Sequence, residues 1–348
     1  MKFDIKVLQG ILDQAVESGE ECGLQLAIYD HGELAVDICS GFADRERKIE
    51  VDRKSLFPIY SCGKGVMAAA FHMLYERGLV DYDAKLADIW PEYGCCGKEE
   101  TLVWHALTHR AGVNQLPELD SQSDMGNWEL MCQKLAAATP STVPGTVCNY
   151  HGITFAWLIG EIANRSSGLD FQEFIGKEIL SALGISGEFY FGTDAAADSR
   201  LVEVDSAPDG WCRSFISDDA IRHGFVPSAN GVATASALAK IYAAAVFGVD
   251  GKRLLKDETI SNAAILRRHP DDPAGDTWAK FGLGWALPNM PETNAVFGHG
   301  GALGGEGFAD LEHGITVGFV KNHQTATHPD HPVRNRISEA LGLRTRRW

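Results

Sequence analysis

The sequence predicts an α+β protein, in which an antiparallel sheet is flanked by terminal helices and carries an inserted helical lobe. Three observations favour this arrangement: β-type runs gather near both ends of the chain, helical patterns dominate between them, and an amphipathic segment lies at each end. We expect residues 1–62 and 215–348 to form one discontinuous sheet domain and residues 63–214 to form the mainly helical lobe. A site is expected in the cleft between them.

The amino-acid composition is that of a soluble globular protein. The chain has 348 residues, of which 45% are hydrophobic and 22% charged, so it can bury a large core. Its net charge of −16 disfavours nucleic acid or an anionic membrane as a partner. No run approaches the roughly 18 apolar residues that span a bilayer, and the N-terminal segment has no signal-peptide apolar region. We therefore expect a cytoplasmic protein.

The 8 cysteines are scattered through the sequence without a C-x-x-C pair. This spacing predicts reduced thiols rather than a disulfide framework or a zinc site. His105 and His109 are four residues apart, but H-A-L-T-H lacks the glutamate of the H-E-x-x-H metal motif. We expect neither a metal nor a cofactor.

The N-terminal part of the chain predicts a helix followed by a β-hairpin. Residues 1–19 place apolar side chains at helical spacing between charged ones. Residues 24–29 and 33–39 are β-type runs, and Asp30-His31-Gly32 between them has a turn composition.

Helical signals dominate the middle of the chain. Start and stop residues predict helices from Gly65 to Arg77, from Asp83 to Pro91, from Leu102 to His109 with Thr101 as cap, from Asn127 to Pro140, from Tyr150 to Arg165, and from Phe174 to Leu183 after the capping pair Asp170 and Glu173.

The pattern changes again after about residue 225. An alanine-rich run at 231–247 predicts a helix, and residues 331–341 predict the last one. Between them, four short runs punctuated by glycine and asparagine predict strands at 281–287, 295–297, 307–310 and 315–322.

The tetrapeptide Ser61-Cys62-Gly63-Lys64 is the strongest candidate for chemistry. The helical pattern that follows places Ser61 at a helix N-terminus and Lys64 one turn later on the same face, with Val66, Ala69 and Met73 on the buried stripe. An uncharged lysine beside a serine can accept the hydroxyl proton, and the helix terminus favours a developing negative charge. Since a lone S-x-x-K spacing also arises by chance, a helix-capping serine followed by a solvated lysine is the alternative.

Two further runs accompany this tetrapeptide. Residues 144–152 read P-G-T-V-C-N-Y-H-G, where a Pro-Gly turn delivers Tyr150 to the start of a helix, and residues 297–302 read F-G-H-G-G-A. Together with L-T-H-R-A-G at 107–112 and F-G-L-G-W at 281–285, the chain resembles the serine β-lactamase-related hydrolases of the class C and D,D-peptidase type, and more closely their esterase branch. The resemblance covers about residues 22–322 and implies a β-lactamase/transpeptidase-like fold.

The resemblance also implies roles for individual residues. Ser61 matches the nucleophile, Lys64 its proton acceptor, and Tyr150 the tyrosine that moves protons to and from the serine oxygen and the leaving group. Such a tyrosine works as a phenolate stabilised by a nearby cation or as a neutral relay. The main-chain N–H groups of Ser61 and Ala302 would form the oxyanion hole.

Two departures from the family pattern bear on the substrate. The segment His299-Gly300-Gly301 stands where the family has K-T-G, and His151-Gly152 follows the tyrosine where the family has Y-x-N. These five residues are the expected substrate-binding positions. A mostly neutral histidine is a poorer partner for a substrate carboxylate than lysine, and the glycine removes an amide side chain.

We therefore expect a serine hydrolase that acts through an acyl-enzyme on small or medium neutral carboxyl esters, its partner being a small-molecule ester. A β-lactamase or a D-amino-acid peptidase is the first alternative, and a non-catalytic binding protein on the same scaffold is the second. The chain has no G-x-S-x-G elbow and no phosphate-loop motif. The natural ester and the oligomeric state stay open.

Overall fold

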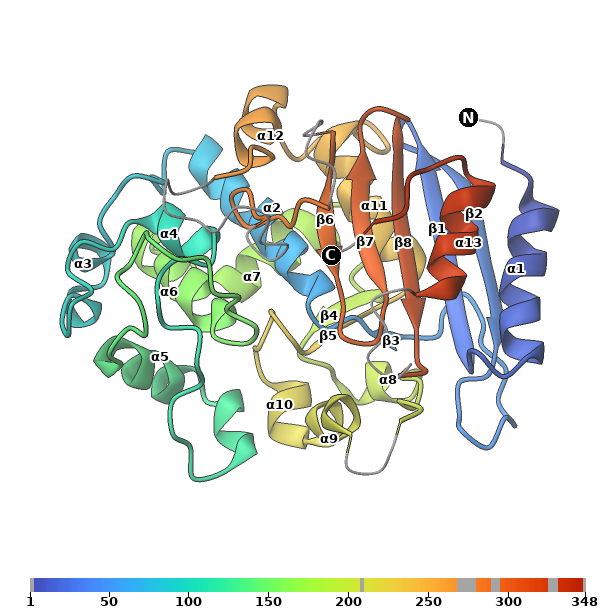
Figure 1. Ribbon diagram of the computed structural model, residues 1–348, viewed down its shortest axis with the longest axis horizontal. Coiled ribbons are helices and arrows are strands. Elements are labelled where there is room, and N and C mark those ends of the chain that lie inside the picture. Colours follow the sequence, from blue (N-terminus) through green and yellow to red (C-terminus); the bar gives the residue numbers. More distant parts are fainter. Residues whose placement is uncertain (1–2, 207–209, 268–279, 289–294, 325–330, 347–348) are drawn as a thin grey trace.

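The computed structural model describes residues 3–206, 210–267, 280–288, 295–324 and 331–346. Its central element is a five-stranded antiparallel sheet with the order β2-β1-β8-β7-β6 (Figure 1). The strands are β1 Gly23–Asp30, β2 Glu33–Gly41, β6 Val296–Gly300, β7 Glu306–Asp310 and β8 Ile315–Lys321. Strands from both ends of the chain are therefore neighbours, and the predicted α+β class with an antiparallel sheet is confirmed.

Helices cover both faces of this sheet (Figure 1). The terminal helices α1 (Ile5–Glu17) and α13 (Pro332–Ala340) pack on one face, where alternate β1 side chains such as Leu24, Leu26 and Ile28 point. Helix α11 (Ala235–Val246) packs on the opposite face, which receives Ala27 and Tyr29. Period-two alternation along β1 thus explains why the sheet has a helix layer on each side.

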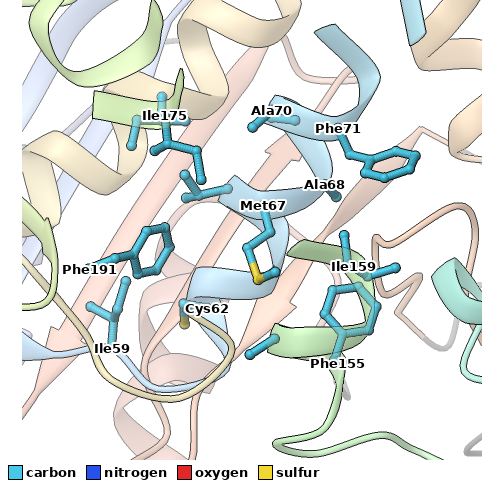
Figure 2. Packing of buried hydrophobic residues seen from close by; sticks show 14 of the residues in the cluster. Ile59, Cys62, Met67, Ala68, Ala70, Phe71, Phe155, Ile159, Ile175 and Phe191 are labelled. Atoms are coloured by element: carbon cyan, nitrogen blue, oxygen red, sulfur yellow. The ribbon is translucent and has the colours of Figure 1, made fainter. Parts of the chain in front are cut away.

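Helix α2 (Cys62–Glu76) lies between the sheet and the remaining helices (Figure 2). We predicted one buried stripe, but every residue from Cys62 to Leu74 is buried. The cause is contact on all sides, with β6 and β7, with α6 and with α11. Small residues permit the close packing, since a methyl group at Gly65 would lie 1.9 Å from the Tyr242 hydroxyl oxygen.

The rest of the chain is mainly helical, with a second, three-stranded antiparallel sheet of order β3-β5-β4. Its strands are β3 Phe57–Pro58, β4 Phe189–Phe191 and β5 Gly231–Ala233. The helices are α3 Leu86–Ile89, η1 Pro91–Tyr93, α4 Val103–Leu107, η2 Gln122–Gly126, α5 Trp128–Ala137, α6 Phe155–Ser167, α7 Phe171–Ile175 with the π-helical turn Gly176–Ser181, α8 Ala195–Asp198, α9 Trp211–Ser217, α10 Asp219–His223 and α12 Asp257–Ala263.

Several predicted elements differ from the structure. Residues 231–233 form β5 instead of the first turn of the alanine-rich helix, because Thr234 caps α11 through its side chain. Residues 281–287 form a turn with isolated bridges rather than a strand. Helix α4 is capped at Leu102, not at Thr101, and the His105 ring accepts the Leu102 N–H.

The prediction that Tyr150 begins a helix is wrong, because α6 begins five residues later with Thr154 at its N-cap. The segment around Tyr150 is held by another part of the chain instead. The Asn149 N–H donates to the His109 carbonyl oxygen at 2.9 Å, and the His151 N–H donates to His109 Nδ1 at 3.1 Å. These bonds occupy the backbone donors on both sides of Tyr150 and hold the segment outside the helix.

None of the helices in the described ranges is long and apolar enough to cross a membrane. The structure describes all 8 cysteines, and none of them is in a disulfide bond.

Candidate active site

Ser61 lies at the junction of β3 and α2. The Ile59 N–H donates to the Gly231 carbonyl oxygen at 2.8 Å, which fixes the strand side of the junction. Tyr60 then adopts the left-handed conformation (φ 45°), and its buried hydroxyl donates to the Cys212 carbonyl oxygen at 2.8 Å. Ser61 occupies the N-cap position, but its side chain makes no capping hydrogen bond. The capping alternative therefore fails, and the hydroxyl is available to other groups.

Lys64 is fully buried, which excludes the alternative of a solvated lysine. Its Nζ lies 3.0 Å from Ser61 Oγ, 2.6 Å from the Gly152 carbonyl oxygen and 2.8 Å from the Ser228 carbonyl oxygen. Burial holds the pKa of Lys64 well below its ordinary value, so the amine is shifted toward its neutral form. A neutral amine has two N–H donors, and the two carbonyl groups take them. Its lone pair is then left for the Ser61 hydroxyl proton.

Tyr150 completes the cluster around the serine. Its hydroxyl is in hydrogen-bond contact with the Ser61 side chain, and Lys64 Nζ lies 5.1 Å from the centre of its ring. Burial raises the pKa of Tyr150 above its ordinary value, so the phenol keeps its proton. Of the two modes open to this tyrosine, the neutral relay fits the structure, because neither a phenolate nor a charged Lys64 is favoured.

Aromatic rings hold Tyr150 in place. Its ring stacks on Phe281 with centroids 5.8 Å apart, and the His109 ring lies 4.9 Å away. His109 accepts the His151 N–H through Nδ1, which places its own proton on Nε2, and burial lowers its pKa. We did not single out His109, Phe281 or Ser228 as functional from the sequence. The first two lie in the family-like runs at 107–112 and 281–285, whereas the carbonyl of Ser228 has no sequence signal.

The end of strand β6 lies against the turn that carries Ser61. A methyl group at Gly301 would lie 2.5 Å from the Ile59 carbonyl oxygen and 3.2 Å from Cys62 Sγ, so the backbone approaches the residues on both sides of the serine. Gly300 pairs with Glu306 at the end of the β6–β7 ladder. In the described part of the chain, the N–H groups of Ser61 and Ala302 donate to no backbone acceptor. Both N–H groups are therefore candidates for an oxyanion hole.

His299 precedes this close approach on β6 and is 5% exposed. Its Nδ1 lies 2.7 Å from the Gly300 carbonyl oxygen, which places the proton on Nδ1 and leaves a lone pair on Nε2. Burial lowers the pKa of His299 to about 3, so the imidazole is neutral. Its ring centre lies 5.9 Å from that of Tyr150. The structure thus brings His299 beside the proposed catalytic tyrosine without a positive charge.

The two residues after Tyr150 contribute differently. Gly152 offers its carbonyl oxygen to Lys64. The His151 side chain is fully buried, and its Nδ1 lies 2.7 Å from the Asn149 carbonyl oxygen within its own loop. No hydrogen bond between His151 and either Ser61 or Lys64 occurs among the described residues.

Other groups near the serine do not offer a second chemistry. Cys62 follows the serine but is fully buried, and burial raises the pKa of its thiol. Within the ranges that the structure describes, no three His, Cys, Asp or Glu side chains are arranged to hold a metal ion.

An α+β fold with a serine against a tyrosine and a buried lysine whose pKa is lowered by burial is typical of a serine hydrolase. The model of the Beta-lactamase family matches residues 8–341, and the chain belongs to that family. The alternative of a non-catalytic binding protein is thereby set aside.

Known relatives agree with this assignment. The chain is 32% identical over 332 residues to the esterase/beta-lactamase LipL of Mycobacterium tuberculosis, covering 86% of this chain and 77% of LipL. Among solved structures, it is similar to a family VIII carboxylesterase, with a TM-score of 0.86, 28% identity and coverage of 97% of this chain and 96% of the other. It is also similar to a penicillin-binding protein homolog from Caulobacter crescentus, with a TM-score of 0.85, 29% identity and the same two coverages. The predicted family and the β-lactamase/transpeptidase-like fold are confirmed.

Proposed function

We propose that this serine hydrolase is a carboxylesterase, which acts through an acyl-enzyme at Ser61 on small or medium neutral esters. The observation that supports a neutral substrate is the state of His299. A buried imidazole whose pKa is about 3 stands where the family it resembles has a lysine. A neutral imidazole with a free lone pair gives no ionic partner to a substrate carboxylate. The esterase names of LipL and of the carboxylesterase structure support the same proposal.

The proposed acylation begins with the proton of Ser61. Lys64 accepts that proton as Ser61 Oγ forms a bond to the ester carbonyl carbon, and the N–H groups of Ser61 and Ala302 stabilise the oxyanion. The carbon–oxygen bond to the alcohol then breaks, and Tyr150 passes a proton to the leaving oxygen. Lys64 returns its proton to the Tyr150 oxygen, so both groups regain their starting states.

Deacylation reverses these roles with water in place of the alcohol. Tyr150 and Lys64 take a proton from a water molecule as the water oxygen attacks the acyl carbon. The bond to Ser61 Oγ then breaks, and the serine recovers its proton as the acid leaves. One ester and one water give one acid and one alcohol.

A β-lactamase or D-amino-acid peptidase is the second candidate, because LipL is named an esterase/beta-lactamase and a penicillin-binding protein homolog has a similar fold. The esterase and the lactamase or peptidase use the same acylation of the serine. They differ in the leaving group, which is an alcohol in the first case and an amine in the second. Rates on nitrocefin and on p-nitrophenyl butyrate separate them. Faster turnover of nitrocefin would favour the lactamase.

A fluorophosphonate probe tests the nucleophile directly. We expect one adduct per chain, located on Ser61 by mass spectrometry of peptides, and no adduct on a Ser61→Ala variant. Loss of p-nitrophenyl butyrate hydrolysis should follow the extent of labelling. An adduct on another residue, with Ser61 unmodified and activity lost, would contradict the proposal.

A further inference from the structure

The Nε2 atom of His299 has no hydrogen-bond partner in the described part of the chain, although it is buried. We propose that this nitrogen accepts a hydrogen bond from a hydroxyl group on the alcohol part of the ester. The preferred substrates are then esters of diols or polyols rather than of simple alkanols. This inference rests on the proposed carboxylesterase function and names the class of alcohol it releases.

The hydrogen bonds around the imidazole fix which nitrogen is free. Nδ1 donates to the Gly300 carbonyl oxygen at 2.7 Å, so the neutral ring carries its only proton there. Nε2 is consequently an acceptor and cannot donate. A buried acceptor without a partner is costly, and a ligand that brings an O–H donor relieves that cost. An ether oxygen or a carboxylate has no donor and would meet the lone pair unfavourably.

The position of His299 points to the alcohol side of the substrate. Tyr150 is the group that contacts Ser61 and passes a proton to the leaving oxygen, so the alcohol part must lie near its hydroxyl. The His299 ring lies beside Tyr150, at 5.9 Å between centroids, and both rings contact Phe281. His299 is therefore on the Tyr150 side of the site, where the proposal places the hydroxyl of the alcohol part.

The surrounding charges favour a neutral hydroxyl over an ionic group. Burial holds His299 neutral with a pKa of about 3, and the neighbouring Lys64 disfavours a proton on the imidazole. His109 and His151 are also buried with lowered pKa values, so the rings on this side of the site are uncharged. Recognition here depends on hydrogen-bond direction and not on charge.

Two matched esters test the inference on the intact enzyme. The esters are 2-hydroxyethyl butyrate and 2-methoxyethyl butyrate, which share the acyl group and differ in the donor. Acid release in a pH-stat should give a kcat/KM ratio of about 5 to 100 in favour of the hydroxyl, because the buried acceptor stays unpaired with the ether. His299→Phe keeps a ring without an acceptor and should bring the ratio near one. His299→Gln keeps an acceptor oxygen and should restore part of the preference.

His223→Phe is the matched control, because this exposed histidine of α10 pairs with Asp198 and not with the site. Its ratio should equal that of the wild type, and circular dichroism should show that all variants are folded. A wild-type ratio near one, with both esters hydrolysed, would overturn the inference and leave the carboxylesterase proposal standing. A preference that survives in His299→Phe would also overturn it. Failure to hydrolyse either ester or p-nitrophenyl butyrate would instead contradict the proposed function.

Discussion

Lys64 Nζ and Ser61 Oγ lie 3.0 Å apart, and both donors of a neutral Lys64 are taken by main-chain carbonyl groups. The carbonyl groups of Gly152 and Ser228 therefore do more than hold the side chain. In the proposed mechanism they hold the amine with its lone pair toward the serine hydroxyl, and burial lowers the pKa of the amine. The direction of proton transfer follows from this arrangement, and the predictions below depend on it.

Replacing the nucleophile should abolish activity without disturbing the fold. We expect Ser61→Ala to lower p-nitrophenyl butyrate hydrolysis by about a thousandfold or more, because no acyl-enzyme can form. The side chain caps no helix, so thermal unfolding should change little. Ser199→Ala is the control and should keep full activity, because this exposed serine is the C-cap of α8 and its hydroxyl donates to the Ala196 carbonyl oxygen. Activity of Ser61→Ala within a few-fold of wild type would contradict the assignment.

Lys64 and Tyr150 should act as one unit. We expect Lys64→Ala and Tyr150→Phe each to lower kcat by orders of magnitude, because each removes one step of the proton path through Ser61. The kcat of the double variant should be close to that of the slower single variant. Both residues serve the same proton path, so removing the second has little further effect once the first is gone. Steady-state kinetics of the three variants check this. If the two losses simply multiply, the residues do not share a path.

The pH dependence of kcat/KM should report Lys64. The amine must be neutral to accept a proton, so activity should fall as the pH drops through its lowered pKa and persist at alkaline pH, where Tyr150 with its raised pKa keeps its proton. Profiles between about pH 5 and pH 10 test this. The acid limb should be the same in His299→Phe, because that imidazole has a pKa of about 3. If the fall in kcat/KM at low pH disappears in His299→Phe, the titrating group is His299 and not Lys64.

Restoring the family residues should move the enzyme toward lactams. A methyl group at Gly152 would lie 3.7 Å from Tyr150 Cε1, an ordinary contact, so the backbone tolerates Gly152→Asn. The double variant Gly152→Asn with His299→Lys should have a higher ratio of kcat/KM for nitrocefin to kcat/KM for p-nitrophenyl butyrate. The increase should be about two to four decades, if each restored contact contributes roughly 1.5 to 3 kcal/mol independently. A ratio unchanged in the folded double variant would show that these positions do not decide the substrate.

Buried neutral histidines should make the fold sensitive to mild acid. The pKa values of His72 and His299 are lowered to about 3, and those of His105 and His151 to about 4. Below pH 6.5 the unfolded chain therefore binds protons that the folded chain does not, and stability falls with the pH until these values are reached. Each such group contributes up to about 1.4 kcal/mol per pH unit.

Urea unfolding at pH 7, 6 and 5 measures this effect. In His299→Phe the free energy of unfolding should change less steeply with pH. The difference should correspond to about one proton fewer bound on unfolding, because one titrating group is removed. A free energy of unfolding that stays constant from pH 7 to pH 5 would contradict the lowered pKa values.

The sequence predicted those parts of the site that side chains determine. The spacing of Ser61 and Lys64 on one helical turn predicts their contact, and turn residues at 30–32 predict the hairpin of β1 and β2. Strands β7 and β8 were predicted because their apolar residues lie between clear turn signals.

Two of the errors have a common physical cause, which is contact between segments distant in sequence. Tyr150 lies outside α6 because His109, 41 residues earlier, binds the backbone on both sides of it. Helix α2 is buried all round because two layers meet on it. The carbonyl of Ser228 cannot be found from side-chain types, since every residue has one. The spacing of apolar residues along one segment does not indicate which distant segments will contact it.

The pairing of β1 with both β2 and β8 has a consequence for the nascent chain. The hairpin of β1 and β2 leaves the ribosome long before β8, so β1 lacks its second neighbour until residues 315–321 have been made. Helix α2 with its serine is synthesised long before β6, which supplies the facing wall of the site. A ribosome-bound chain that stops before Ile315 should therefore expose unpaired edges on β1 and β7 and hydrolyse no ester. Ester hydrolysis by the growing chain should therefore begin only after β8, the middle strand of the sheet, has been synthesised.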